Sequence, residues 1–146
     1  MGAAMNHIIM EAENLCERVG LRLTDPRRRV LALLADAKTP LKAYDIIAKA
    51  GPDGGAVQPP TVYRALEFLC QLGIVHKIEQ DATFVACSHL GHGHLAALFV
   101  CDLCHKVTEV HMGDIERQLT LAAQNMGFAL ANLVIEGRGK CQSCQA

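Results

Sequence analysis

The sequence predicts an α+β protein made of two small domains, and three patterns predict it. Residues 7–72 contain four stretches with the apolar spacing of helices, and residues 74–87 read as a β-hairpin. The remainder reads as strand, strand, helix, strand. A chain of 146 residues can form one domain or two small ones, so we divide it into residues 1–88 and 89–146.

The composition restricts the class of protein. No apolar run reaches the ~20 residues that a membrane span requires, and the N-terminus lacks a basic leader followed by an apolar core. We therefore expect a cytoplasmic protein with no membrane partner. The seven cysteines are an odd number, and in a reducing compartment they are more often metal ligands or redox groups than disulfides.

The first three predicted helices have clear start and stop signals. One covers residues 7–19. The next is capped by Thr24 or Asp25 and has Pro26 in its first turn, a position that suits proline. The third spans about 42–50 and is closed by Gly51.

The fourth helix is expected to begin after Pro59-Pro60, since proline cannot lie inside a helix. Its apolar residues repeat at three- and four-residue steps and predict a buried face, whereas Tyr63 and Arg64 fall on the rest of its surface.

Helices followed by a hairpin fit a winged helix-turn-helix, in which one helix enters the major groove of DNA. An unrelated small helical domain with a hairpin would give the same pattern. The run Arg27-Arg28-Arg29 suits phosphate contact, but such a run is also common on a solvated helix face.

The C-terminal part predicts strands over 98–101 and 106–110, a helix over 112–126 and a strand over 128–137. A unit of about 55 residues buries little surface by itself. We therefore expect its stability to require a cross-link within the chain, a partner chain or both.

Two C-x-x-C pairs predict such a cross-link. Cys101 and Cys104 form one pair, and Cys141 and Cys144 form the other. Four thiolates suit zinc and give a closed tetrahedron, which does structural work. A redox reading would need a single pair in a thioredoxin-like setting.

A second group of potential ligands remains once these four are set aside: His76, Cys87, His94 and Glu109. Two imidazoles, a thiolate and a carboxylate are a feasible zinc set, and the two anions would balance the charge of the ion. Spacing alone does not show that the four side chains meet, and isolated histidines and glutamates are usually ordinary surface or core residues.

Nearly the whole chain resembles the ferric uptake regulator superfamily of bacterial metalloregulators. The resemblance rests on LRLTDPRRRVLALL, PPTVYRALEFLCQLGIVHKIE, HGHLAALFVCDLC and the closing CQSC, in that order. The interval between His94 and Cys101 and the thiolate of Cys87 are typical of its zinc uptake regulator branch.

This resemblance implies a homodimeric, zinc-responsive transcriptional repressor of zinc-uptake genes. Its first domain would be a winged helix-turn-helix that binds DNA, and its second a small α/β dimerisation domain. Two zinc ions per chain are implied: a structural one on the four C-x-x-C cysteines, and a regulatory one on His76, Cys87, His94 and Glu109. His92 could replace His94, and His89 could join a third site.

The resemblance also implies that the operator is palindromic, A/T-rich double-stranded DNA. Tyr44 and Arg64 would contact bases. Thr61 and Tyr63 would meet phosphate or sugar, although Tyr63 could instead pack between helices. Backbone phosphates would be met by Arg27, Arg28 and Lys42.

Other functions stay open at this point. A ferrous-iron or peroxide sensor of the same family would share the fold, and a zinc-ribbon protein-interaction module would share the C-x-x-C pairs. We expect no enzyme, because a hydrolytic zinc needs an open coordination position and both predicted sites are filled by four protein ligands.

Overall fold

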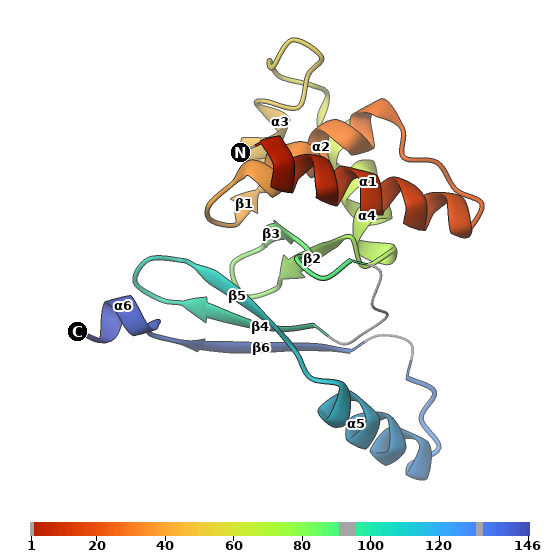
Figure 1. Ribbon diagram of the computed structural model, residues 1–146, viewed down its shortest axis with the longest axis vertical. Coiled ribbons are helices and arrows are strands. Elements are labelled where there is room, and N and C mark those ends of the chain that lie inside the picture. Colours follow the sequence, from red (N-terminus) through yellow and green to blue (C-terminus); the bar gives the residue numbers. More distant parts are fainter. Residues whose placement is uncertain (1, 91–95, 131–132) are drawn as a thin grey trace. The chain divides into compact units, whose positions relative to one another are not determined.

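The computed structural model describes residues 2–90, 96–130 and 133–146 (Figure 1). The chain divides into two compact units, Met1–Gly91 and His92–Ala146, and each contains a three-stranded sheet. The predicted α+β class is confirmed. Within the described ranges, no helix combines the length and the apolar character needed to cross a membrane.

The first unit has the four expected helices: α1 (Gly2–Arg18), α2 (Asp25–Asp36), α3 (Ala43–Ile47) and α4 (Pro59–Gln71). Their apolar faces, together with two residues that lead into the hairpin, form one core, and α2 packs directly on α4. Its deeply buried aliphatic side chains include Leu31, Ile46, Val62, Leu66, Leu69 and Ile74.

Three details of these helices differ from the sequence prediction. α1 begins at Gly2, five residues earlier than expected. α3 is shorter than expected and ends at Ile47. The expectation that Pro59-Pro60 precede the fourth helix is wrong, because both lie in the first turn of α4. The N–H groups of a first turn have no acceptor inside the helix, so prolines are tolerated there.

The predicted hairpin is confirmed as β2 (Val75–Ile78) and β3 (Thr83–Ala86). A two-residue strand that the sequence did not predict, β1 (Leu41–Lys42), adds to the other edge of β3. The sheet order is β1-β3-β2 with antiparallel pairing throughout. This short extra strand ties the segment before α3 to the hairpin.

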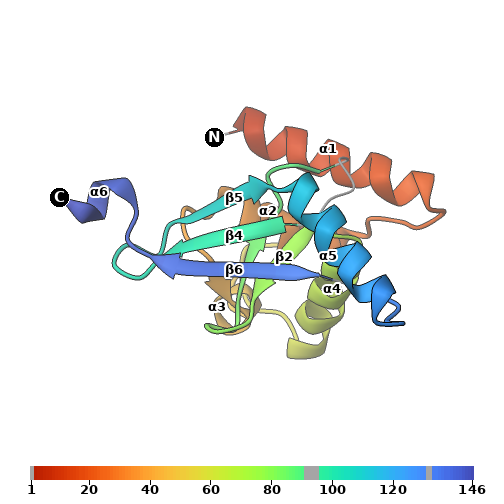
Figure 2. The same cartoon turned by 90° about the horizontal axis from the view of Figure 1, so that it is seen from below.

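The second unit contains β4 (Ala96–Cys101), β5 (Val107–His111), α5 (Gly113–Asn125), β6 (Val134–Gly139) and α6 (Gln142–Gln145). Figure 2 shows β4 in the middle of the sheet, antiparallel to β5 and parallel to β6. The predicted strand over 128–137 is wrong at its start, since residues 128–130 are not in a strand and β6 begins at Val134. The short α6 was not predicted.

The second unit leaves much apolar surface uncovered. α5 buries none of its residues. Beyond its end, Met126 is 84% exposed and Phe128 is 62% exposed, and Leu121 on the helix is half exposed. A soluble helix normally buries an apolar stripe, so this surface is suited to a partner chain.

Candidate metal centres and nucleic-acid interface

The four cysteines of the two C-x-x-C pairs come together in the second unit. The four sulfur atoms all lie within 4.8 Å of one another; they belong to Cys101, Cys104, Cys141 and Cys144. Cys101 ends β4, Cys104 lies in the turn that follows, and the other two lie at the start of α6 and within it. Four convergent sulfurs are the donor set of a closed zinc site.

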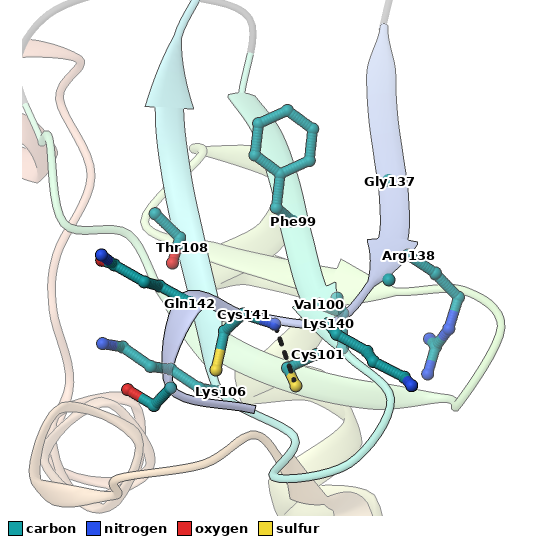
Figure 3. Close-up of a pocket in the computed structure, with 12 residues that line it drawn as sticks. Phe99, Val100, Cys101, Lys106, Thr108, Gly137, Arg138, Lys140, Cys141 and Gln142 are labelled. Atoms are coloured by element: carbon teal, nitrogen blue, oxygen red, sulfur yellow. Dashed lines mark hydrogen bonds between the residues drawn. The ribbon is translucent and has the colours of Figure 1, made fainter. Parts of the chain in front are cut away.

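The sheet brings the two pairs together. β4 and β6 run parallel with Cys101 opposite Gly139, and the N–H of Asp102 donates to the Gly139 carbonyl at 2.8 Å. The chain therefore leaves β6 beside the first pair. Figure 3 shows the next contact, in which the N–H of Cys141 donates to the sulfur of Cys101 at 3.4 Å.

The four thiols cannot all ionise easily by themselves. N–H groups of Cys104, Cys141 and Leu103 lower the pKa of Cys101 to about 6. Hydrogen bonds with the neighbouring sulfurs raise the pKa of Cys144 to about 12. The first thiolate is thus stabilised and the last is opposed by the charge already present. A divalent cation removes this conflict, so the donor set fits zinc.

An open hollow of about 550 Å³ lies beside the cysteines, on the face of the sheet that carries Phe99 (Figure 3). Lys106, Arg138 and Lys140 line it, and Arg138 Nε lies 2.9 Å from Asp102 Oδ1. A zinc bound by four thiolates has a net charge of −2, which nearby cations stabilise. These basic neighbours of the cysteines were not predicted from the sequence, although Lys106 and Lys140 lie close to the C-x-x-C pairs along the chain.

His76 and Cys87 come together within the first unit. Their ligand atoms lie within 4.8 Å of each other. His76 is on β2, and Cys87 directly follows β3, where its N–H donates to the Ile74 carbonyl at 2.9 Å. The Cys87 side chain is 1% exposed, and its sulfur accepts the N–H of His89 at 3.4 Å. An imidazole on one strand and a buried, hydrogen-bonded sulfur just past the end of its neighbour are half of a zinc ligand set.

The other predicted ligands are not grouped with His76 and Cys87 inside the first unit. Glu109 is half-buried on β5, opposite Leu98 of β4. His92 and His94 lie outside the described residues. His89 is exposed, and its Nδ1 lies 3.0 Å from Ser88 Oγ.

The predicted DNA-contacting residues of α3 and α4 are accessible. Tyr44 is 80% exposed, Tyr63 is 56% exposed and Arg64 is exposed, whereas Thr61 is half-buried. Burial of Val62 and its neighbours on one face of α4 directs Tyr63 and Arg64 outward. The large exposure of Tyr63 argues against the alternative of packing between helices.

The predicted phosphate contacts have partners inside the first unit. The Arg27 guanidinium lies 3.4 Å above the Phe68 ring centroid, and its Nη1 donates to the Arg22 carbonyl at 2.6 Å. Arg28 forms a salt bridge with Glu13 of α1. Phosphate contact by Arg27 and Arg28 stays a prediction, and the role of Phe68 is one that sequence reasoning missed.

Comparison with known proteins agrees with this geometry. The model of the ferric uptake regulator family matches residues 18–137. The chain is 37% identical over 138 residues to the zinc uptake regulation protein of Escherichia coli (strain K12), which covers 94% of this chain and 81% of that protein.

Two solved structures have the same fold. A zinc uptake regulator complexed with zinc and DNA has a TM-score of 0.88 and 35% identity, covering 98% of this chain and 96% of the other. The crystal structure of holo XcZur has a TM-score of 0.85 and 40% identity, covering 96% and 98%. The predicted winged helix-turn-helix followed by a small α/β unit is thereby confirmed. On the family match and these identities, the chain belongs to the ferric uptake regulator family.

Proposed function

We propose that this chain is a zinc-responsive transcriptional repressor that binds operator DNA as a homodimer, and that it is not an enzyme. One observation supports this most strongly: the four-cysteine cluster and the His76–Cys87 pair are separate metal-ligand groups in different units. Two groups of different chemistry allow one zinc to maintain the fold and another to report zinc supply. The similarity to a regulator solved with zinc and DNA points the same way.

The structural zinc would be held by Cys101, Cys104, Cys141 and Cys144. Zinc supplies the divalent charge that keeps all four thiolates ionised together. Because no ligand position is left open, this site is unsuited to hydrolytic chemistry. It would keep the end of β6 and α6 attached to β4.

The regulatory zinc would be held by His76 and Cys87 of the first unit with His94 and Glu109 of the second. The donor set supports the proposal: a thiolate and imidazoles favour zinc over harder ions, and the thiolate and the carboxylate balance its charge. An ion shared by both units would restrict their mutual orientation. Two ions per chain follow from the two sets.

Zinc would act by raising the fraction of dimers able to bind DNA. A dimer must present two α4 helices at the spacing of successive major grooves. If zinc raises the competent fraction from a few per cent to nearly all, affinity for the operator increases by the same factor, or roughly 2 kcal/mol.

Recognition would use α3 and α4. The guanidinium of Arg64 can donate two hydrogen bonds to guanine O6 and N7, and Tyr44 would contact a second base. Tyr63 and Thr61 would contact phosphate or sugar, which fixes the register of the helix without reading sequence. The operator would be palindromic and A/T-rich.

The homodimer would form through the second unit. The uncovered apolar residues of α5 and the segment that follows it supply a surface that a second copy can bury.

Metal titration with a DNA readout tests the proposal. Apo-protein would be mixed with a fluorescent duplex, obtained by selecting a random pool with the zinc-treated chain, and titrated with zinc, ferrous iron or manganese. We expect zinc to induce binding at the lowest free concentration. Induction by ferrous iron at lower concentration would favour the iron-sensing alternative.

A further inference from the structure

We propose that Arg27 is a positioning residue for the recognition helix rather than a phosphate contact. This inference rests on the proposed function, because it assigns α4 to DNA recognition. Arg27 lies on α2 and Phe68 lies on α4, and the guanidinium carbon is 3.4 Å from the ring centroid. A cation this close to a ring face is held by the ring quadrupole.

A second contact also fixes the guanidinium. Arg27 Nη1 donates a 2.6 Å hydrogen bond to the Arg22 carbonyl, in the segment between α1 and α2. The side chain is half-buried. Between a ring face and a carbonyl, the planar group is held in one orientation, which a flexible ammonium would not reproduce.

The stacking bears on recognition through helix geometry. Phe68 lies four residues after Arg64 on α4, so the two side chains project from successive turns on one side of the helix. Phe68 packs against the core, whereas Arg64 is exposed. Anchoring Phe68 to α2 therefore fixes the turn that carries Arg64. A small rotation of this turn would misalign a bidentate contact with a base.

The neighbouring arginines provide a contrast. Arg28 pairs with Glu13 of α1, and Arg29 Nε donates to the Ala50 carbonyl at 2.8 Å. Neither interaction joins α2 to α4. Arg28→Gln is therefore a matched comparison, since it removes the same charge from the adjacent position without touching the recognition helix. As a predicted phosphate contact, Arg28 should affect the selected and the scrambled duplex equally.

A double-mutant cycle tests the proposal. Arg27→Gln, Phe68→Leu and the double variant would be compared for binding to the selected duplex and to a scrambled duplex, with zinc present and at several salt concentrations. We expect each single variant to bind the selected duplex about tenfold more weakly. The double variant should bind no more weakly than either single variant, because both substitutions remove the same interaction.

The salt dependence separates positioning from phosphate binding. If Arg27 met a phosphate, Arg27→Gln would lower the salt slope by about one and weaken binding to both duplexes equally. We expect an unchanged slope, a lower ratio of selected to scrambled binding, and no change in that ratio for Arg28→Gln. A reduced slope for Arg27→Gln with additive effects of Phe68→Leu would overturn the proposal.

If Arg27→Gln fails to fold, Arg27→Lys distinguishes a positioning role from a phosphate contact. Lysine keeps the charge and can meet a phosphate, but it cannot stack a planar group on Phe68 while donating to the Arg22 carbonyl. Full affinity in Arg27→Lys would overturn the proposal. A wild-type chain that selects no preferred duplex would instead overturn the proposed function.

Discussion

The sulfur of Cys104 lies 3.8 Å from the sulfur of Cys141, although the two residues are 37 positions apart in the chain. The parallel pairing of β4 with β6 produces this proximity, and the hydrogen bond from Asp102 to the Gly139 carbonyl continues it past the end of the strands. A metal held by these sulfurs would fasten the segment that follows β6 to the end of β4.

Replacement of Cys141 by serine should destabilise the second unit. A structural zinc in a small domain supplies folding free energy on the order of 10 kcal/mol, and a three-thiolate site retains only part of it. Zinc content should fall by about one ion per chain, and amide exchange within β6 should become fast. Cys70→Ala is the control, because burial raises the pKa of Cys70 to about 11 and the residue lies outside both ligand groups. Retention of both ions in Cys141→Ser would contradict the assignment.

Thiolate formation in metal-free protein should be stepwise. The pKa of Cys101 is lowered from 9.0 to about 6, so one thiolate per chain should appear in the ultraviolet absorbance between pH 5 and 7. A lowered pKa in the folded state means that the unfolded chain binds more protons between about pH 6 and 9. The Cys101 thiolate therefore stabilises the folded, metal-free protein fully above pH 9, and this stabilisation is lost as the pH falls through 6. Cys101→Ser should remove the step, whereas an unchanged absorbance profile would show that another group titrates.

Replacement of Cys87 by serine should abolish zinc-dependent DNA binding while leaving a folded dimer. Serine fits the buried position but is a poor zinc ligand, so the gain of about 2 kcal/mol, or roughly thirtyfold in affinity, should disappear. The measurement is duplex binding with and without zinc, together with zinc content and sedimentation. His7→Ala, which changes an exposed histidine on α1, should behave as wild type. Zinc-induced binding that survives in Cys87→Ser would remove Cys87 from the switch.

Substitution of Arg64 by alanine should weaken recognition without affecting folding. Loss of a bidentate contact with guanine costs about 1–3 kcal/mol and relaxes preference at one base pair. Because Arg64 is exposed, the free energy of unfolding should change by less than about 0.5 kcal/mol. Binding to single-base variants of the selected duplex measures the effect. Glu67→Gln, at an exposed position on the same helix, is the control. Equal weakening on every duplex would indicate a phosphate contact instead.

An acidic residue at Phe128 should dissociate the homodimer. Phe128→Asp places a charge in the uncovered apolar surface of the second unit, and we expect the dissociation constant to rise by at least about tenfold. Met10→Asp introduces the same charge at an exposed apolar residue of α1 and should leave the dimer intact. Analytical ultracentrifugation distinguishes the results, and a Phe128→Asp dimer of unchanged affinity would place the interface elsewhere.

The sequence predicted most of the fold because its signals are local. Apolar periodicity and Gly73, whose φ is +69°, mark α4 and its end. β1 escaped prediction because a two-residue strand has no periodicity and depends on its pairing with Phe84 and Thr83. The prolines of α4 were misplaced because a first helical turn and a preceding loop accept proline equally well.

The candidate sites also differ in whether a local sequence pattern predicts them. Two C-x-x-C pairs carry a strong pattern, and the structure brings their sulfurs together. The stacking of Arg27 on Phe68 could not be predicted, because it depends on how α2 packs against α4. The run of three arginines left phosphate contact and a solvated helix face as alternatives, and in the structure each arginine has a different partner in the first unit.

The most direct test of the two-site account is zinc stoichiometry during mild chelation, measured in parallel with duplex binding and dimer mass. We expect protein loaded with two zinc ions per chain to lose about one ion together with DNA binding, while the dimer and its second ion persist. Simultaneous loss of both ions with unfolding, or undiminished DNA binding after one ion has left, would contradict it.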